Sequence, residues 1–507
     1  MSIRVRIAPS PTGNLHIGTA RAALFNYLYA KRYDGKFILR IEDTDLERSD
    51  KKYEENIFQG LEWLGIEWDE GPIAFAQNQK SKIKNQKYNG DYGPYRQSER
   101  IATYKKYIGQ LLADGKAFYC FHSEEELEKE REGLMGMKRP PVHLCEYREM
   151  NPEEAGMLTE AKSDYIIRFK TPAGRKIEFH DLIRGDLSFE SDLIGDFSIA
   201  KRVDVPLYNF AVVVDDHEMK ISHVIRGEDH ISNTPKQILL AEALGFPLPQ
   251  FAHLPLILGQ DRSKMSKRHG ATSVSEYREA GYLPEAFLNF MALLGWNPGD
   301  DREIFSKEEL IREFSIEKVQ KSGAVFDVKK LDWMNGEYIR QKSVKELTTL
   351  CVPFLEKVGL RQAQAISPER SRGTTKKRDD YLEKIIALEQ PRLKKLSEIG
   401  ERVDYFFREP EYDKELLRWK DMTDIEISKS LHESIAILKK YDGALTKEKL
   451  ESAFLAAIGD GDKGRLLWPL RVALSGKKAS PGPFEIMEVL GVEKSLRRIH
   501  NTAKKLM

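Results

Sequence analysis

Cysteine is scarce in this sequence. The 507 residues include only three cysteines, Cys120, Cys145 and Cys351. That number excludes a disulfide scaffold and is typical of a protein from a reducing compartment. Long apolar runs are absent as well, so no segment is predicted to span a bilayer. The first ten residues, MSIRVRIAPS, lack the apolar core of a secretory signal. We therefore expect a soluble, cytoplasmic protein without membrane contacts.

An excess of charge is also absent, because 81 Lys and Arg residues stand against 80 Asp and Glu residues. Bulk charge therefore gives no sign of a nucleic-acid partner, and any surface that attracts anions must be local. We find no internal repeat. The length is sufficient for about three or four domains.

The N-terminal segment predicts a βαβ unit. Residues 3–7 alternate apolar and basic, and residues 8–13 contain two prolines and a glycine that end a strand. Helical spacing follows from Ala20 to about Tyr33. The apolar run from Phe37 to Ile41 suits a strand buried on both faces of a parallel sheet. Strand, glycine turn, helix and strand are the opening of a doubly wound nucleotide-binding fold.

The rest of the chain predicts further α/β structure and then helices. Residues 100–200 alternate short helical and strand-like segments, as an inserted α/β lobe does. From Pro284 onward helical periodicity dominates. Three apolar runs between these regions are expected to be strands: Phe210–Val214, Ile221–Ile225 and residues 251–258.

Two polar segments are expected to lack regular structure. Residues 75–95 are rich in Lys, Asn and Gln and predict a solvated loop. Residues 367–380 are polar and basic without an apolar stripe, which makes them the best candidate for a linker.

The hinge between the first strand and the first helix suits an anion. A helix N-terminus has unpaired N–H groups and a partial positive charge, and it binds phosphates. Gly18 lets a ligand approach the backbone, and His16 can donate a hydrogen bond to a phosphate oxygen. A plain capping or packing role for His16 fits this short segment equally well.

A second anion-directed element lies at residues 261–270, DRSKMSKRHG. It places Arg262, Lys264, Lys267 and Arg268 around a serine, and lysine ammonium groups can neutralise the charge that develops as pyrophosphate leaves. An ordinary solvated run of charges is the alternative. Two such elements, each after a predicted buried strand, favour a nucleoside triphosphate site.

Longer stretches resemble one family. HIGT and KMSKR resemble the two signatures of class I aminoacyl-tRNA synthetases, in the variants of the glutamyl branch. Seven further segments of the chain are similar to bacterial-type glutamyl-tRNA synthetases: RIAPSPTG, LRIEDTD, GPYRQSER, YNFAVVVDD, VIRGEDHISNTPKQ, LDWMNGEYIR and PLRVALSGKKASPGPFEI. The resemblance implies an α/β Rossmann-type catalytic core with an inserted acceptor-binding lobe, then stem-contact and all-helical anticodon-binding domains. The expected ranges are 1–100 and 201–260 for the core, 101–200 for the lobe, 261–345 for the KMSKR loop and stem-contact domain, and 346–507 for the helical region.

The resemblance also implies the reaction. ATP, with Mg²⁺, and L-glutamate would give glutamyl-adenylate and pyrophosphate, and the glutamyl group would then pass to the 3′ end of tRNA(Glu). His16, Lys264 and Lys267 are the implied catalytic residues, and Gly18 and Arg268 join them in binding ATP. Catalysis would consist of positioning and charge stabilisation at the α-phosphate. We expect a monomer.

The glutamate pocket should hold buried positive charge for the side-chain carboxylate. By resemblance Arg6 and Arg226 contact that carboxylate, with the bidentate geometry of a guanidinium. Glu42 would bind the α-ammonium, and Ser10 and Tyr208 complete the pocket. The chain departs from the family at two positions, with Val212 for asparagine and Asp229 for glutamate, and the resemblance assigns no contact there.

Arg392 matches an arginine that family members direct at the third anticodon base, C36. It predicts a discriminating enzyme, whereas enzymes that also charge tRNA(Gln) often lack it. A solvated basic residue on a helix surface is the alternative.

The inserted lobe contains an incomplete metal motif. Some relatives bind zinc there through a Cys-x-Cys half-site and a later cysteine. Here Cys120, His122 and Cys145 offer three ligands, and His143 and Tyr147 are the candidates for a fourth. A structural zinc needs four ligands, so the sequence favours two unmodified thiols and no metal.

Four other identities fit the sequence less well. Glutaminyl enzymes carry Pro-Glu-Pro-Asn before the first motif, where this chain has Pro-Ser-Pro-Thr, and a β-barrel anticodon module. The shorter paralogue that glutamylates a tRNA base lacks the anticodon region, and small nucleotidyltransferases are much shorter. A non-catalytic tRNA-binding paralogue should have lost His16 or a signature lysine, and none is lost here.

Overall fold

The computed structural model describes residues 2–45, 47–73, 87–161, 164–359, 375–441 and 446–506, with the backbone alone for 152 and 375–378. The chain divides into two compact units, residues Met1–Arg278 with Pro284–Val328, and Glu279–Leu283 with Lys329–Met507. Most of the expected loop at 75–95 and of the expected linker at 367–380 lies outside the described residues.

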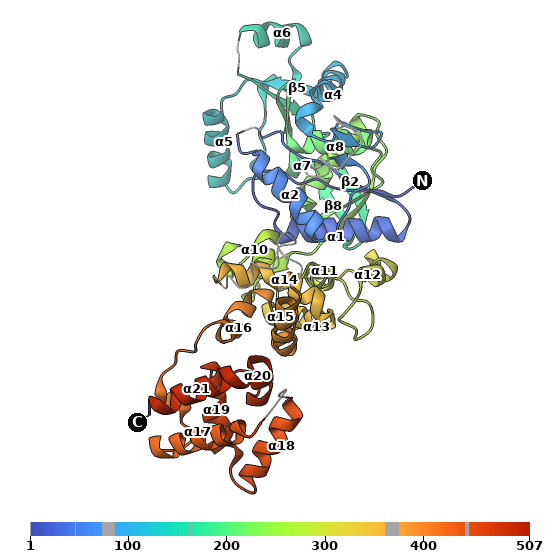
Figure 1. The fold of residues 1–507 in the computed structure, drawn as a ribbon. Coiled ribbons are helices and arrows are strands. Elements are labelled where there is room, and N and C mark those ends of the chain that lie inside the picture. The colour runs from blue at the N-terminus through green and yellow to red at the C-terminus, as the bar shows by residue number, and fades with distance from the viewer. Residues whose placement is uncertain are drawn as a thin grey trace. The chain divides into compact units, whose positions relative to one another are not determined.

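The first unit begins with the expected βαβ arrangement (Figure 1). Strand β1 (Arg4–Ile7) leads to helix α1 (Ile17–Arg32) and strand β2 (Lys36–Leu39), and β1 pairs with β2 in parallel. Gly35 is required before β2, because a Cβ there would lie 2.6 Å from the carbonyl oxygen of Ile3. The Rossmann-type opening predicted from sequence is therefore confirmed.

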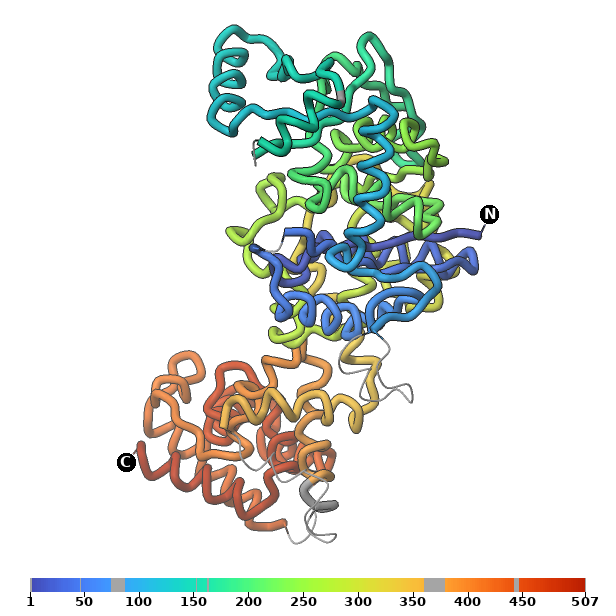
Figure 2. Tube along the Cα trace, turned by 90° about the horizontal axis from the view of Figure 1, so that it is seen from above, coloured from blue at the N-terminus to red at the C-terminus, as the bar shows by residue number. Residues whose placement is uncertain are grey.

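The second half of the core sheet comes from much later in the chain. Strands β11 (His223–Gly227) and β12 (Gln250–Leu254) pair in parallel, and β12 continues to β7 (Lys176–Asp181) and β8 (Gly185–Glu190). Strand β1 contacts β11, and the Ser222 N–H donates to the Arg4 carbonyl oxygen at 2.9 Å. Figures 1 and 2 show the blue N-terminal elements beside the green segments of this half.

Two of the predicted strands differ from the structure. Residues Phe210–Val214 belong to helix α8 (Tyr208–Glu218), in which every residue from 210 to 216 is buried. A continuous apolar run does not distinguish a buried strand from a buried helix, and here the prediction was wrong. Residues 251–258 form two strands rather than one, because β13 (Ile257–Leu258) separates from β12 at Pro255 and pairs with β14 (Ala324–Val325).

The inserted lobe, expected at residues 101–200, has a sheet of its own, whose last strand lies beyond residue 200. Its antiparallel strand order is β10-β9-β6-β5, from β5 (Ala117–Cys120), β6 (Ile166–Phe169), β9 (Phe197–Arg202) and β10 (Val205–Pro206). Strands β7 and β8 fall in the same range of residues, yet they extend the core sheet. The helices of this range are α4 (Ile101–Ala113), α5 (Glu124–Gly136), α6 (Pro152–Ala161) and α7 (Ser191–Ile194).

Smaller elements complete the first unit. They are α2 (Lys51–Trp63), β3 (Gly71–Pro72), β4 (Tyr88–Asn89), α9 (Thr234–Ala243), α10 (Val274–Glu279), α11 (Pro284–Leu293) and α12 (Lys307–Glu313). Short 3-10 helices occur at Gln97–Glu99, Glu146–Glu149, Glu228–Asn233, Lys267–His269 and Ile316–Lys318.

The second unit is helical, as predicted. No strand occurs among its described residues. Its helices are α13 (Val328–Gln341), α14 (Val344–Lys357), α15 (Thr375–Glu389), α16 (Ile399–Phe407), α17 (Asp424–Lys439), α18 (Lys447–Ile458), α19 (Lys463–Ser475), α20 (Pro483–Leu490) and α21 (Val492–Lys504). Three 3-10 helices join them, Gln390–Arg392, Leu396–Glu398 and Lys414–Leu417.

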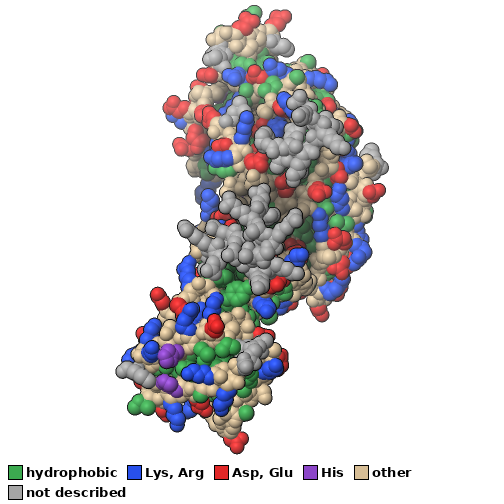
Figure 3. All heavy atoms as spheres, viewed as in Figure 1, with side chains coloured by type: hydrophobic (Ala, Val, Ile, Leu, Met, Phe, Trp, Pro, Cys, Tyr) green, Lys and Arg blue, Asp and Glu red, His purple; other side chains and the backbone are tan. Residues whose placement is uncertain are grey.

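The surface shows the same balance of charge as the composition. On the face drawn in Figure 3, Lys and Arg side chains are interspersed with Asp and Glu side chains rather than gathered in one basic patch. Among the described residues, no helix combines the length and the apolar character needed to cross a membrane.

Candidate active site

His16 caps helix α1 and is oriented by the backbone it caps. Its Nδ1 accepts a hydrogen bond from the Gly18 N–H at 3.0 Å. Nδ1 is therefore unprotonated, and the neutral ring carries its proton on Nε2. Burial lowers the pKa of His16, and the positive charge of Lys264 lowers it further. The hinge thus offers a neutral imidazole N–H beside the unpaired amides of a helix N-terminus.

A cavity of about 470 Å³ opens beside this hinge. It lies where β1 and β11 end, at the edge of the sheet where open α/β folds bind ligands. The structure brings together eight of the predicted residues in its lining, namely Arg6, Ser10, His16, Gly18, Glu42, Tyr208, Arg226 and Lys264. Lys267 and Arg268 do not line it, and Arg392 belongs to the second unit.

The KMSKR segment follows β13 and is held as a compact loop. The N–H of Met265 donates to the Ile257 carbonyl, and the 3-10 helix Lys267–His269 follows. Lys264 Nζ lies 3.1 Å from Asp229 Oδ2, and both side chains line the cavity. Burial would raise the pKa of Asp229, but its hydrogen bond with Lys264 lowers it. This pair holds the lysine side chain at the cavity.

Arg226 is a buried cation without an anionic partner. Its Nε donates to His253 Nε2 at 3.2 Å and its Nη2 to Thr234 Oγ1 at 2.8 Å. Nη1 is buried and forms no hydrogen bond with the protein. No carboxylate among the described residues forms an ion pair with the guanidinium, and burial lowers the pKa of Arg226. A buried cation of this kind is costly unless an anion binds to it.

Arg6 differs from Arg226 because an acid already neutralises it. Its Nε and Nη2 lie 3.1 and 3.2 Å from the two oxygens of Asp216. Asp216 also accepts from Arg40 Nη1 at 2.7 Å, and Arg40 Nη2 donates to Glu42 at 3.1 Å. Burial would raise the pKa of Asp216, but Arg6 and Arg40 lower it. Burial raises the pKa of Glu42, against the opposing effect of Arg40.

Sequence reasoning missed several residues of this site. Asp216 lies two residues beyond the run Phe210–Val214, which we expected to be a strand, and His253 had no local motif around it. His230 was also missed, and its Nδ1 lies 3.0 Å from the Tyr208 hydroxyl. Burial and the nearby Arg226 charge lower the pKa of His230 to about 4. The acidic pair at 215–216 and the histidines at strand ends were the only signals in the sequence.

The four-residue cluster in the inserted lobe is more complete than the sequence suggested. The ligand atoms of Cys120, His122, His143 and Cys145 all lie within 4.8 Å of one another. His143 supplies the fourth position, which corrects the expectation of an incomplete ligand set. The Tyr147 ring instead packs on the His122 ring at 5.1 Å. Hydrogen bonds from Cys145 and His122 favour the thiolate and hold the pKa of Cys120 well below its usual range.

Arg392 ends a 3-10 helix in the second unit. Its Nη1 lies 3.6 Å from Glu389 Oε1 and forms no hydrogen bond, and the Glu389 side chain is only 1% exposed. Burial raises the pKa of Glu389. Leu393 and Leu396 are buried below the arginine, so the segment is anchored while part of the guanidinium stays accessible.

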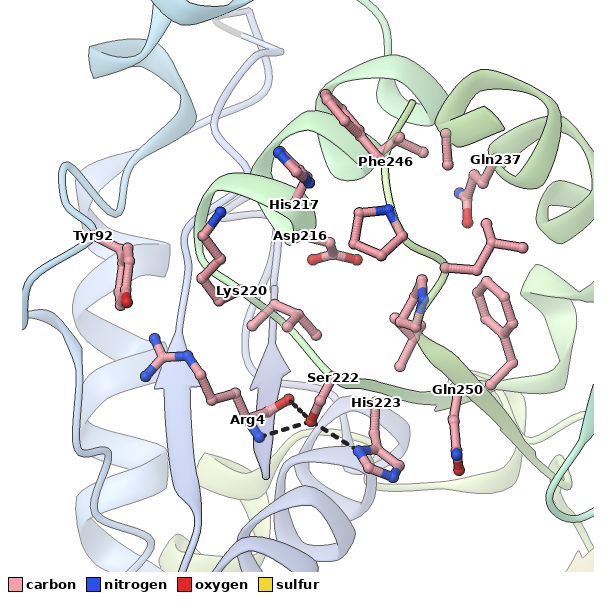
Figure 4. A pocket seen from close by; sticks show the side chains of 18 of the residues that line it. Arg4, Tyr92, Asp216, His217, Lys220, Ser222, His223, Gln237, Phe246 and Gln250 are labelled. Carbon is pink, nitrogen blue, oxygen red and sulfur yellow. Dashed lines mark hydrogen bonds between the residues drawn. The ribbon is translucent and has the colours of Figure 1, made fainter. Parts of the chain in front are cut away.

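A larger cavity of about 780 Å³ lies at the opposite edge of the sheet, at the start of β11 and β12 (Figure 4). There Ser222 lies between Arg4 and His223 and hydrogen-bonds to both. Arg4 is neutralised by Glu70 through two bonds of 2.8 and 2.9 Å. Neither of the two signature segments lines this cavity, so the chemistry of the smaller one marks the candidate active site.

Comparison with known proteins decides the family. Residues 2–333 match the model of the tRNA synthetases class I (E and Q) catalytic domain, and residues 346–503 match an anticodon binding domain. The chain belongs to the class I tRNA synthetases of the E and Q branch. The two matches together account for the core, the inserted lobe and the helical unit.

Individual relatives extend over the whole length. The chain is 47% identical over 510 residues to the glutamate–tRNA ligase 1 of Caldicellulosiruptor saccharolyticus, covering 98% of both chains. It is 45% identical over 512 residues to the glutamate–tRNA ligase of Desulforamulus reducens, covering 99% of this chain and 100% of the relative. A crystal structure of a glutamate tRNA ligase from Elizabethkingia meningosepticum in complex with its amino acid matches with a TM-score of 0.84 at 35% identity, covering 100% of both chains.

Proposed function

We propose that the protein is a glutamate–tRNA ligase that activates L-glutamate with ATP and transfers it to tRNA(Glu). The observation that carries the proposal is Arg226, a buried guanidinium with no carboxylate partner, in one cavity with His16 and Lys264. A carboxylate substrate supplies the missing anion. The full-length relatives with this name support the same activity.

In the first step an oxygen of the glutamate α-carboxylate attacks the α-phosphorus of ATP, and pyrophosphate leaves. The Nε2–H of His16 and the N-terminal amides of α1 donate to phosphate oxygens. Lys264 exchanges Asp229 for a phosphate, and loop movement brings Lys267 and Arg268 to the same phosphates. Mg²⁺ would enter with ATP, since its preferred oxygen ligands are phosphates and a few carboxylates.

In the second step a hydroxyl of the terminal ribose of tRNA attacks the carbonyl carbon of the adenylate. AMP leaves with the electron pair of the broken bond, and its phosphate takes up the hydroxyl proton. The protein contributes by holding both reactants in line. Glu42 holds the α-ammonium, with Arg40 fixing its carboxylate. Ser10 and Tyr208 complete the walls of the amino-acid end.

Selection of glutamate over glutamine follows from charge. The two substrates are nearly the same size, so shape alone separates them poorly. Glutamate supplies the anion that Arg226 lacks, whereas the amide oxygen of glutamine can accept a hydrogen bond but carries no counter-charge. The site therefore rejects the amide because it leaves a buried cation without an anion.

We further propose that Arg392 makes the enzyme discriminating. The guanidinium releases Glu389 and donates to the acceptors of C36, whereas guanine at that position presents an N–H that arginine cannot pair. Charging of tRNA(Gln) by the wild-type enzyme would contradict this assignment.

We propose zinc at the cluster in the inserted lobe. Two thiols and two imidazoles at mutual distances below 4.8 Å fit the closed tetrahedral set of a structural zinc. Glu130 accepts from His143 Nδ1 and so directs Nε2 of that ring toward Cys120. The metal would tie β5 to the segment around Cys145 and would take no part in the reaction.

The decisive experiment is charging of purified tRNA(Glu) and tRNA(Gln) with labelled glutamate or glutamine. We expect glutamyl-tRNA(Glu) alone among the four products, with ATP converted to AMP and pyrophosphate. Charging with glutamine but not glutamate would refute the assignment. We also propose a monomer located in the cytoplasm, which light scattering of the purified protein and cell fractionation would test.

A further inference from the structure

Arg226 stands at the end of a row of three buried side chains, one from each of three neighbouring strands. Arg226 on β11 pairs in register with His253 on β12, and Asp181 on β7 lies next to β12. His253 Nδ1 is 2.6 Å from Asp181 Oδ2, and His253 Nε2 is 3.2 Å from Arg226 Nε. Asp181 and His253 are both fully buried.

We infer that Asp181 and His253 are positioning residues for Arg226, holding its guanidinium so that Nη1 faces the glutamate side-chain carboxylate. The inference rests on the proposed function, because it assigns a task within the same amino-acid pocket. Neither residue lines the cavity, so both act through Arg226.

The carboxylate of Asp181 sets the tautomer of the ring. An ionised carboxylate accepts the proton of Nδ1, which leaves Nε2 with a lone pair. That lone pair faces the Arg226 Nε–H at 3.2 Å, and the Thr234 hydroxyl oxygen lies 3.1 Å from the same nitrogen. With the opposite tautomer, two N–H groups would face each other at 3.2 Å. Asp181 therefore turns His253 into an obligatory acceptor.

Thr234 completes the support of the guanidinium. Its Oγ1 accepts from Arg226 Nη2 at 2.8 Å, and it is fully buried. Two of the three guanidinium nitrogens are thus fixed by neutral groups, and Nη1 alone remains without a partner. Because the guanidinium is planar, fixing Nε and Nη2 also fixes the direction of Nη1.

The neutral imidazole of His253 orients Arg226 but does not neutralise its charge. Asp216 contacts Arg6 directly and neutralises its charge. His253 instead separates Arg226 from the negative charge of Asp181, so it orients the arginine without satisfying it. The full charge of Arg226 stays available to the substrate. Because of this difference, Arg226 rather than Arg6 is the residue whose charge distinguishes the side-chain carboxylate of glutamate from an amide.

Two substitutions of His253 separate orientation from packing. In His253→Gln the side-chain amide oxygen reaches the position of Nε2 and keeps an acceptor for Arg226. In His253→Asn the shorter amide reaches the position of Nδ1, keeps the bond to Asp181 and removes the acceptor. Both variants replace a ring by an amide, so each controls for the packing defect of the other.

The assay is ATP–pyrophosphate exchange in the presence of tRNA(Glu), with the KM for glutamate and for ATP measured separately. We expect His253→Asn to raise the KM for glutamate about 10- to 100-fold, the usual worth of a hydrogen bond to a charged group. The KM for ATP should change less than about threefold, and His253→Gln should restore most of the glutamate affinity. Equal losses in the two variants, or a parallel rise in the KM for ATP, would overturn the inference.

A second pair of variants covers the case in which substitution of His253 prevents folding. Thr234→Val is nearly isosteric and removes the acceptor of Nη2, and Thr234→Ser keeps it. The valine variant should show the same selective rise in the KM for glutamate, and the serine variant should not. If both Thr234 variants keep the wild-type KM, the positioning role is wrong. A wild-type enzyme that fails to charge glutamate at all would instead refute the proposed function.

Discussion

Replacing Arg226 by methionine removes a charge from the cavity at little cost in volume. The guanidinium makes two hydrogen bonds to neutral groups and none through Nη1, and no described carboxylate pairs with it. If Arg226 binds the substrate carboxylate, methionine leaves that carboxylate buried without its counter-charge. Breaking one side of a buried ion pair costs about 3–5 kcal/mol.

That energy converts to a fall in kcat/KM for glutamate of roughly 150- to 4,000-fold, at about 1.4 kcal/mol for each factor of ten. The measurement is steady-state charging of tRNA(Glu) over a range of glutamate and ATP concentrations. The KM for ATP should stay within about threefold of wild type, since Arg226 is at the amino-acid end. Arg226→Lys keeps the charge but loses the planar guanidinium. Its kcat/KM for glutamate should lie between the values for wild type and for Arg226→Met.

The thermal stability of the same variant separates a binding arginine from a structural one. A buried guanidinium that lacks an anion destabilises the fold that holds it, and substitution by an apolar side chain of similar volume relieves this cost. We therefore expect the Tm of Arg226→Met to equal or exceed that of wild type while activity is lost. A large fall in Tm, together with unchanged kcat/KM for glutamate, would refute the assignment of Arg226.

The remaining predictions concern the hinge, pH, the metal cluster and the anticodon. His16→Ala should slow adenylate formation in single-turnover assays by about 10²–10³-fold, the usual effect of losing one preorganised donor, while tRNA binding in filter assays stays unchanged. Burial lowers the folded-state pKa of His16, His230 and His253, that of His230 to about 4. The unfolded chain therefore takes up protons first, so urea unfolding should show stability falling from pH 6.5 toward pH 4, less steeply in His230→Asn. Metal analysis should find one zinc per chain, and His143→Ala or a chelator should lower the metal content and the Tm without changing the KM for glutamate. Arg392→Gln should reduce the preference for tRNA(Glu) over tRNA(Gln), measured as the ratio of kcat/KM values, by about 1–3 kcal/mol.

Local signals in the sequence were sufficient for the hinge and for the first half of the core. The helix start at His16 and Gly18 depends on residues within a few positions of one another, and the structure has them as N-cap and first turn. The helical C-terminal unit also follows from local periodicity. Leu393 and Leu396, close to Arg392 in the sequence, are buried there.

The rest of the site depends on contacts between distant parts of the chain. Asp216, the partner of Arg6, is 210 residues away in sequence. It lies two residues beyond the Phe210–Val214 run that we expected to be a strand, and its side chain reaches Arg6 from helix α8. His253 meets Arg226 through the register of two parallel strands, which no local pattern specifies. His143 likewise reaches Cys120 only because the lobe folds residues 120–122 against 143–145.

Charge balance connects these distant contacts to the choice of substrate. Ion pairs neutralise most of the charged groups at and below the cavity, namely Arg6, Arg40, Arg100, Glu42, Asp215, Asp216, Lys264 and Asp229. Two buried guanidinium groups of the lining, those of Arg21 and Arg226, have neutral hydrogen-bond partners instead of an ion pair. Arg21 donates its terminal nitrogens to the carbonyls of Pro255 and Leu294, and Arg226 to His253 and Thr234.

We propose that each of these two cations binds an anion supplied by a substrate. Arg21 follows the hinge on α1, where phosphates of ATP would bind, and Arg226 is at the amino-acid end. Glutamate carries one more negative charge than glutamine, and that charge is what the unpaired Arg226 lacks. The partners of Arg226 within the protein are neutral, so in this proposal its charge remains available to the glutamate carboxylate. An acid in the place of His253 would satisfy Arg226 beforehand, and the distinction between a carboxylate and an amide would be lost.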